Sequence, residues 1–526
     1  MHIFAHFFIY LMQKKTLRGI FMDCKNEIIK FDAVDTKKIL TSVSGKEAVS
    51  PGAMVLSCVA NACCGRCETL SGEAILEGAV NFTVVLNEEG EIRVCEHTER
   101  FAVNEKIDGI VPKTKMLSSA NAQNVKAIVE AGNLHISANV EICATVISSN
   151  EAEVCSEFIG DDVIKKGEEI CYSNVDFASN LRFSVNGETS LSPRLPEVER
   201  VLSTNATAFV EEAHIASGQL VFGGSIHFQT VYLSLDEFEP IVQVCDKIGF
   251  SQIIDVDALD ATPEINLCVE EITAQVVTSE EGLRNVLSYS AMLCGYTFSF
   301  NKHSIEIIDD VFSTTHYVET IKKKIDTTLL NEKISSKISQ HFDVMLPAGK
   351  TPIARINSVN FSPFGCKAII ENSRATIDAS AEVSVIYTAA GTNVLDGFNV
   401  NVPLKIVYDD SQLRDVKDAL IKLNLIEMQA MLSSGNEIEI RATMMIELIP
   451  IDKIEKEIIS QINVGQMREP EEFGLVIYFA EDGETLWDIA KKFAISIDEL
   501  LAINPDIKET VKKGDKLYIF RQLKVC

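Results

Sequence analysis

Internal repetition is the feature that most constrains the fold of this chain. Aligned without gaps at an offset of 146 residues, Val55-Leu56-Ser57 falls on Val201-Leu202-Ser203. A second ungapped offset of 155 places Asn205 on Asn360. A unit that recurs three times predicts three domains of similar topology, because each copy has to bury a similar set of apolar residues.

Alternation of apolar and polar residues inside the units predicts strands rather than helices. Residues 74–86, 220–233 and 375–388 each read as the second limb of a long hairpin, and a strand bearing a phenylalanine follows, around Phe101, Phe250 and Phe398. One helix-prone stretch, 410–420, interrupts the third copy. The chain is therefore predicted to be mainly β, with three tandem antiparallel β-sandwich or barrel-like repeats whose strand order the sequence leaves open.

Two glycines occupy matching positions in the first two copies. Gly78 falls on Gly224 at the offset of 146, within predicted strands. Glycine inside a strand is typical of a bulge or of a close approach of two backbones. We therefore expect bulky substitutions at either position to destabilise the copy that carries it.

The segment 476–520 has a different organisation, with two short helices between two strands. Thr485 lies three residues before Asp488, and Ser496 three before Glu499, which is the spacing of a capping box at each helix start. Asn504-Pro505 ends the second helix because proline has no amide hydrogen and restricts the residue before it. The predicted order is β-α-α-β.

This segment resembles a LysM module. The resemblance rests on Tyr478, the turn 483–487, Ile489-Ala490, Leu500, Asn504-Pro505 and Gly514. It implies binding of glycans that contain N-acetylglucosamine, such as peptidoglycan, or of a protein partner through the same face. The groove would come from two segments, Gly483, Glu484, Thr485 and Leu486 in the first and Asn504, Pro505, Asp506 and Ile507 in the second. Trp487 either packs between helix and sheet or lines the edge of this groove.

The predicted organisation along the chain has six parts. The three β repeats span residues 22–165, 166–310 and 311–460, followed by a linker at 461–472 and the LysM module at 473–522. The linker is expected to let the module move relative to the repeats. Residues 1–21 are a doubtful extension, either an upstream start ahead of Met22 or a segment that lies on a surface, because their apolar stretch is shorter than the roughly 20 residues a membrane span needs.

The net charge indicates which classes of partner to expect, and the cysteine content indicates the redox state of the compartment. The chain carries 48 basic and 76 acidic side chains, a net charge of −28, which opposes binding to nucleic acids and to anionic membranes. Proteins or neutral glycans are the expected partners. The 14 cysteines are irregularly spaced, which favours free thiols in a reducing, cytoplasmic compartment.

Sites for catalysis or metal binding are not predicted. Cys64 and Cys67 form a C-x-x-C, but no second such pair or histidine pair completes a four-ligand set, so packing is the favoured interpretation. Paired carboxylates such as Glu211-Glu212 and Glu270-Glu271 are more typical of solvated strand edges than of an acid and base. We expect no cofactor, no metal and no enzymatic activity.

The combination of three β repeats with a terminal LysM module resembles the clostridial SPOCS-domain and LysM proteins. The resemblance implies a non-enzymatic scaffold or anchor of spore coat assembly, located in the mother-cell cytoplasm at the forespore surface. Its partner would be the spore coat morphogenetic ATPase or another coat-assembly protein, with peptidoglycan as a further ligand. The alternative is a cell-wall-associated, peptidoglycan-binding LysM protein.

Overall fold

The computed structural model describes residues 23–159, 162–256, 263–392, 394–414, 416–468, 475–507 and 511–520. The doubtful extension at 1–21 lies outside these residues. Antiparallel sheets make up the repeats, and a β-α-α-β unit follows them, which confirms the predicted fold class. Within the described residues, no helix has the length and apolar character to cross a membrane.

Each repeat is built from strands in the same order. The first repeat contains β1 (Asp23–Ala48), β2 (Met54–Thr69), β3 (Glu73–Glu88), β4 (Glu91–Lys106), β5 (Lys115–Glu130) and β6 (Asn133–Ile159). The second contains β7 (Val163–Ser190), β8 (Val198–Ala216), β9 (Gln219–Ser234), β10 (Ile241–Asp255), β11 (Glu264–Val277) and β12 (Val286–Ser313). The third contains β13 (His316–Leu330), β14 (Ile334–Met345), β15 (Ile353–Glu371), β16 (Arg374–Ala389), β17 (Leu395–Asp409), the short 3-10 helix η1 (Ser411–Leu413), β18 (Asp418–Ser434) and β19 (Glu437–Met467).

Two sheets face each other in every repeat. One sheet is formed by three consecutive strands, as in β2-β3-β4. In the other sheet the long last strand is central, between the first strand of the repeat and the strand that precedes it in sequence, as in β1-β6-β5. The third repeat divides the first strand into β13 and β14, which both pair with β19. Alternate residues of the middle strands, such as Leu76, Val80 and Phe82 in β3, are buried between the sheets.

Matching β-bulges show that the two sequence offsets mark equivalent positions. The strand register shifts between Val55 and Ser57 in β2, between Val201 and Ser203 in β8, and between Ile356 and Ser358 in β15. These positions are related by the offsets of 146 and 155. The three copies thus share both their topology and the position of this β-bulge, as expected if the bulge has a structural role.

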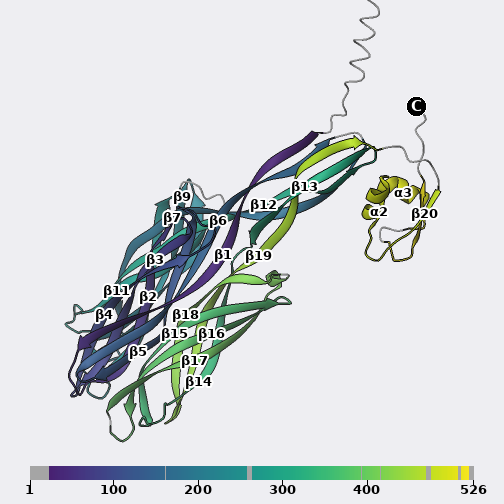
Figure 1. Cartoon of the computed structure of the whole chain (residues 1–526). Coiled ribbons are helices and arrows are strands. Elements are labelled where there is room, and N and C mark those ends of the chain that lie inside the picture. Colours follow the sequence, from purple (N-terminus) through teal and green to yellow (C-terminus); the bar gives the residue numbers. More distant parts are fainter. Residues whose placement is uncertain are drawn as a thin grey trace, which may run out of the picture.

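The ends of the long strands form an arm that projects from the three sandwiches (Figure 1). Beyond each sandwich, β1 pairs only with β6, β7 only with β12, and β13 only with β19, so each repeat contributes a two-stranded ribbon. Apolar residues of all three ribbons pack together, among them Phe31, Val154, Ile170, Ile307 and Ile458. An isolated two-stranded ribbon is marginally stable in water. The arm therefore depends on all three repeats.

A cyclic set of buried hydrogen bonds joins the three ribbons at the base of the arm. In each bond, a backbone amide of one ribbon donates to a side chain of the next. The bonds are Val34 N to Thr328 Oγ1 at 3.0 Å, Leu330 N to Ser173 Oγ at 3.1 Å, and Val175 N to Asp32 Oδ2 at 2.6 Å. All six residues are buried. The acceptor in each strand lies two residues before the donor, so the ring follows a threefold pattern.

The two matched glycines lie where two backbones approach closely, which confirms the prediction. A Cβ atom at Gly224 would lie 2.0 Å from the carbonyl oxygen of Phe209, and one at Gly78 would lie 2.2 Å from that of Cys63. Across the sheet, Phe250 pairs with Gly224 and Phe101 with Gly78.

A phenylalanine-bearing strand follows the second limb of the hairpin in every copy, as predicted, with Phe101 in β4, Phe250 in β10 and Phe398 in β17. Two other sequence-based expectations need correction. Among the described residues of the helix-prone stretch 410–420, the helical structure is a single 3-10 turn, and β18 begins at Asp418. Cys155 departs from the expected free thiols because it is disulfide-bonded.

The predicted linker is also wrong over 461–467. Strand β19 continues to Met467. Within it, Ile462 pairs with Thr320 and Val464 pairs with Val318 of β13. Ile462 packs against the arm core, so the apolar alternation extends the strand. Residues 469–474 lie outside the described part of the chain. Strand β7 begins near the predicted repeat limit at 165, and strand β12 ends about three residues beyond the limit at 310. The domain limits themselves remain predictions.

Substitution of Gly224 tests the close approach. Gly224→Ala should lower the free energy of unfolding by about 1–3 kcal/mol, because the added carbon overlaps the Phe209 carbonyl. Gly249→Ala in the neighbouring strand is the control, since its Cβ would lie 3.8 Å from the nearest atom. Urea denaturation followed by circular dichroism measures the difference. Equal stability of the two variants would contradict the prediction.

Glu382 of β16 should make stability depend on pH. Its side chain is buried and accepts a hydrogen bond from the Val125 amide of the first repeat at 3.3 Å, and burial raises the pKa of Glu382 to about 7. The carboxyl ionises near 4.5 in the unfolded chain. Between these values the folded state binds more protons, so stability should fall as the pH rises from about 4.5 to about 7 and then level off.

The pH dependence can be assigned by substitution. Glu382→Gln should remove a loss on the order of 3 kcal/mol across this range. Asp378→Asn, an exposed position in the same strand, should leave the dependence unchanged. Denaturation at a series of pH values measures both, and an unaltered profile in Glu382→Gln would refute the assignment.

Candidate functional site

The C-terminal module contains β20 (Leu475–Phe479), α2 (Leu486–Phe493), α3 (Ile497–Ile503) and β21 (Lys516–Phe520). Both predicted capping boxes are present. Thr485 accepts from the Asp488 amide while the Asp488 side chain accepts from the Thr485 amide, and Ser496 and Glu499 do the same for α3. Each box satisfies amide groups that a helix start leaves without partners. Strands β20 and β21 pair antiparallel beneath the helices.

The first predicted groove segment combines exposed and structural residues. Gly483 is exposed, adopts φ +83° and has open space where a Cβ would be. Glu484 accepts hydrogen bonds from the Glu481 amide and the Tyr478 hydroxyl, both at 2.8 Å, and these contacts lower the pKa of its carboxyl. Leu486 is buried in the module core, and Thr485 is occupied as the cap of α2.

The second predicted segment is divided in the same way. Asn504 is only 4% exposed, and its side chain ties α3 to β21. It accepts from the Tyr518 amide at 2.6 Å and donates to the carbonyl oxygens of Tyr518 and Leu500 at 2.7 and 2.8 Å. Pro505 and Asp506 are exposed, and Ile507 packs partly against the core. The exposed residues of the two segments remain the predicted binding surface.

Trp487 packs partly against the module core, as one of its two predicted roles requires, and also makes a contact with the arm that the sequence did not indicate. Its indole Nε1 donates to Asp310 Oδ2 of β12 at 2.8 Å, and its ring meets Phe312 edge to face at 5.1 Å between centroids. Lys491 also binds Asp310, at 2.7 Å, and Ile164 packs at the same contact. The tryptophan therefore docks the module on the end of the arm.

Hydrogen bonds at this contact favour the ionised form of the Asp310 carboxyl. Burial alone would raise the pKa of Asp310, but the hydrogen bonds from Lys491 and Trp487 outweigh burial and lower it. The register of β12 shifts between Ile308 and Asp310, at a bulge in the pairing with β7. Bulges redirect side chains and strand edges. No sequence pattern marks this site, because Asp310 and Trp487 are 177 residues apart.

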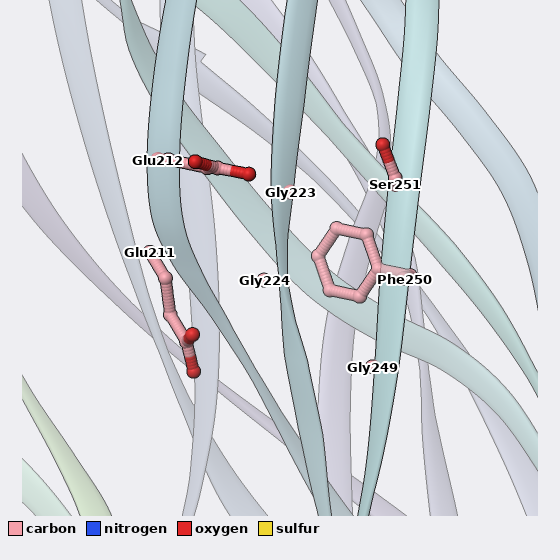
Figure 2. A pocket seen from close by; sticks show the side chains of 7 residues that line it. All are labelled: Glu211, Glu212, Gly223, Gly224, Gly249, Phe250 and Ser251. Carbon is pink, nitrogen blue, oxygen red and sulfur yellow. The ribbon is translucent and has the colours of Figure 1, made fainter.

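A hollow on the second repeat contains the carboxylate pair that the sequence singled out. Figure 2 shows Glu211 and Glu212 beside Gly223, Gly224 and Phe250. These residues line a cavity of about 550 Å³. Glu211 accepts hydrogen bonds from Lys247 at 2.9 Å and from Ser225 at 2.8 Å, which lower the pKa of its carboxyl. A carboxylate held ionised in this way is unsuited to act as a general acid.

The C-x-x-C cysteines lie at the edge of the first sandwich. Cys64 and Cys67 pack against its core, where Ser118 donates to Cys64 at 3.3 Å and Cys67 lies 3.1 Å from the Met116 sulfur. Their neighbour Cys63 instead meets Cys268 and Cys294 of the second repeat. Sequence spacing could not indicate that group, since it joins cysteines more than 200 residues apart.

Fluorescence of Trp487 should report on the docking of the module, because it is the single tryptophan of the chain. Asp310→Ala should shift the emission maximum to longer wavelength and increase quenching by acrylamide, since the indole loses its acceptor and reaches water. Asp309→Ala, at a neighbouring carboxylate bound to Lys166, is the control. If the two variants have the same emission spectrum, the contact does not exist in solution.

Two known families match parts of this chain. The family described as "SipL, SPOCS domain" matches residues 197–277, which run from the start of β8 through β11 of the second repeat. The family described as "LysM domain" matches residues 481–525. Neither the curated proteins nor the solved structures gave a match to this chain. The chain therefore carries a SipL-type SPOCS domain and, after its three β repeats, a LysM domain.

Proposed function

We propose that this protein is a non-enzymatic scaffold of spore coat assembly that acts in the mother-cell cytoplasm at the forespore surface. The observation that carries the proposal is the presence of a SipL-type SPOCS domain and a LysM domain in one chain. Both are binding or scaffold domains. The first is named after a protein of the spore coat, and the second supplies a separate binding module.

The architecture supports simultaneous binding of two partners. The three repeats form a body with an arm, and the LysM module contacts the end of that arm through Trp487. Sites linked in one molecule bind at high effective concentration when the geometry allows both to be engaged. The body would bind one coat component while the exposed loops of the LysM module bind another.

Charge favours a protein partner for the body. A net charge of −28 raises the rate of association with basic surfaces and opposes association with nucleic acid. We propose a coat-assembly protein as that partner. The LysM module would contact the spore coat morphogenetic ATPase through the surface that includes Gly483, Pro505 and Asp506.

Charge reversal on the LysM surface tests the proposal. In the full chain, Asp506→Arg should weaken binding to the coat ATPase about tenfold or more, as for a residue that contributes at least 1.4 kcal/mol. Asp498→Arg makes the same charge change at the other end of α3 and should bind as the unmodified protein does. Surface plasmon resonance with the purified ATPase measures both affinities.

Deletion and glycan binding distinguish the alternative function. A chain lacking residues 473–526 should lose its ring-shaped localisation around the forespore while the β repeats keep their circular dichroism spectrum. Sedimentation with purified peptidoglycan measures glycan binding in parallel. Tight, Asp506-dependent binding to peptidoglycan, with no binding to the ATPase, would replace the proposal by the wall-associated LysM protein.

A further inference from the structure

Three cysteine sulfurs meet between the first and second repeats. Cys63 lies in β2, and Cys268 and Cys294 lie opposite each other in β11 and β12. Their Sγ atoms are 3.3 Å apart for Cys63 and Cys268, 3.7 Å for Cys63 and Cys294, and 3.1 Å for Cys268 and Cys294. All three thiols are free. Neither repeat contains the complete group, so it exists only in the assembled fold.

Comparison of the three repeats shows that packing does not require sulfur here. The same kind of contact recurs between β8 and β18 and between β15 and β5. By the offset of 146, Phe209 of β8 stands where Cys63 stands in β2. The strand pair equivalent to Cys268 and Cys294 is Ala122 and Val140 in the first repeat and Asn424 and Met445 in the third. The three thiols are therefore a property of one interface, not of the fold.

The distances between the sulfurs suit a metal ion. Sulfur atoms that share a tetrahedral zinc ion lie about 3.8 Å apart, since each Zn–S bond is about 2.3 Å long. The observed separations of 3.1 to 3.7 Å are shorter than this by about 0.1 to 0.7 Å, so a bound ion would hold the three sulfurs slightly further apart, at one face of such a tetrahedron. A disulfide would use only two of the three sulfurs. Soft thiolate donors favour zinc over magnesium or calcium, which bind oxygen.

A fourth coordination position has space beside the sulfurs. A cavity of about 1180 Å³ is lined by these cysteines and by residues of all three repeats. Cys268 is exposed and the other two are partly buried, so a cation can reach the sulfurs from solvent. An open fourth position is typical of zinc sites that bind a water molecule or a ligand.

Two basic side chains lie near the sulfurs. Arg182 of β7 pairs with Cys294 of β12 in the strand register. Lys422 of the third repeat donates to Asn266, two residues before Cys268, at 2.7 Å. Cations near cysteine are typical of sulfurs that bind metals or react.

We propose that Cys63, Cys268 and Cys294 bind one zinc(II) ion, with the fourth position facing the cavity between the repeats. The ion would join the first repeat to the second by bonds to both. This inference is independent of the coat-assembly proposal, because it concerns the interior of the repeats rather than the LysM surface. It also revises the expectation of no metal, which rested on the spacing of nearby residues alone.

Cobalt(II) titration of the full, reduced and metal-free chain tests the site. Cobalt bound by thiolates absorbs through sulfur-to-metal charge transfer, and we expect one cobalt per chain, displaced by added zinc. Cys268→Ala and Cys294→Val introduce the residues that the first repeat has at the equivalent positions, so the fold should be retained. Each should weaken metal binding at least about tenfold, as for loss of supporting contacts in known sites.

Control variants separate this site from other cysteines. Cys171→Ser, at an exposed thiol in β7, should bind cobalt as the unmodified chain does, and so should the Cys64→Ser, Cys67→Ser double variant. Circular dichroism confirms folding of each variant. The proposal is overturned if cobalt gives no charge-transfer band, if the band depends on Cys64 and Cys67 instead, or if the reduced protein binds no metal and mass spectrometry finds a disulfide within the triad.

Discussion

The ring of hydrogen bonds at the base of the arm is the interaction on which the arrangement of the repeats depends. Asp32, Ser173 and Thr328 each accept an amide of the next ribbon in a buried setting. A buried amide without an acceptor costs about 1–3 kcal/mol, so loss of one ribbon would leave polar groups of the others unsatisfied. The three repeats are therefore not structurally independent of one another. Their stability is shared, although each sandwich has its own core.

Threefold pseudosymmetry gives the chain three related interfaces, and these have diverged. The interface between the first and second repeats has three thiols, whereas the other two have phenylalanine and other non-cysteine residues at equivalent positions. Glu382 likewise joins the third repeat to the first through a single buried carboxyl. Divergence of this kind lets one topology provide different chemistry at each contact, because the backbone is fixed by shared strands and bulges while side chains vary.

The position of the LysM module follows from the length of the arm. The ribbons extend β12 far enough for Asp310 and Phe312 to reach Trp487 and Lys491, while Pro505 and Asp506 remain exposed. Of the residues predicted to form the groove, Leu486 and Asn504 instead hold the module together, since one is in its core and the other joins α3 to β21. The remaining exposed loops are free to bind a partner.

The sequence by itself determined the local structure of this protein. Strand alternation, the matched Gly78 and Gly224, and the capping boxes at Thr485 and Ser496 follow from interactions between residues close in the chain or from simple periodicity, and all appear in the structure. Only the tertiary structure decided how the repeats meet. The hydrogen-bond ring, the docking of Trp487 on Asp310 and the meeting of Cys63 with Cys268 and Cys294 each join residues more than 100 positions apart. Their juxtaposition depends on strand order and on packing between repeats, which a period along the chain does not encode.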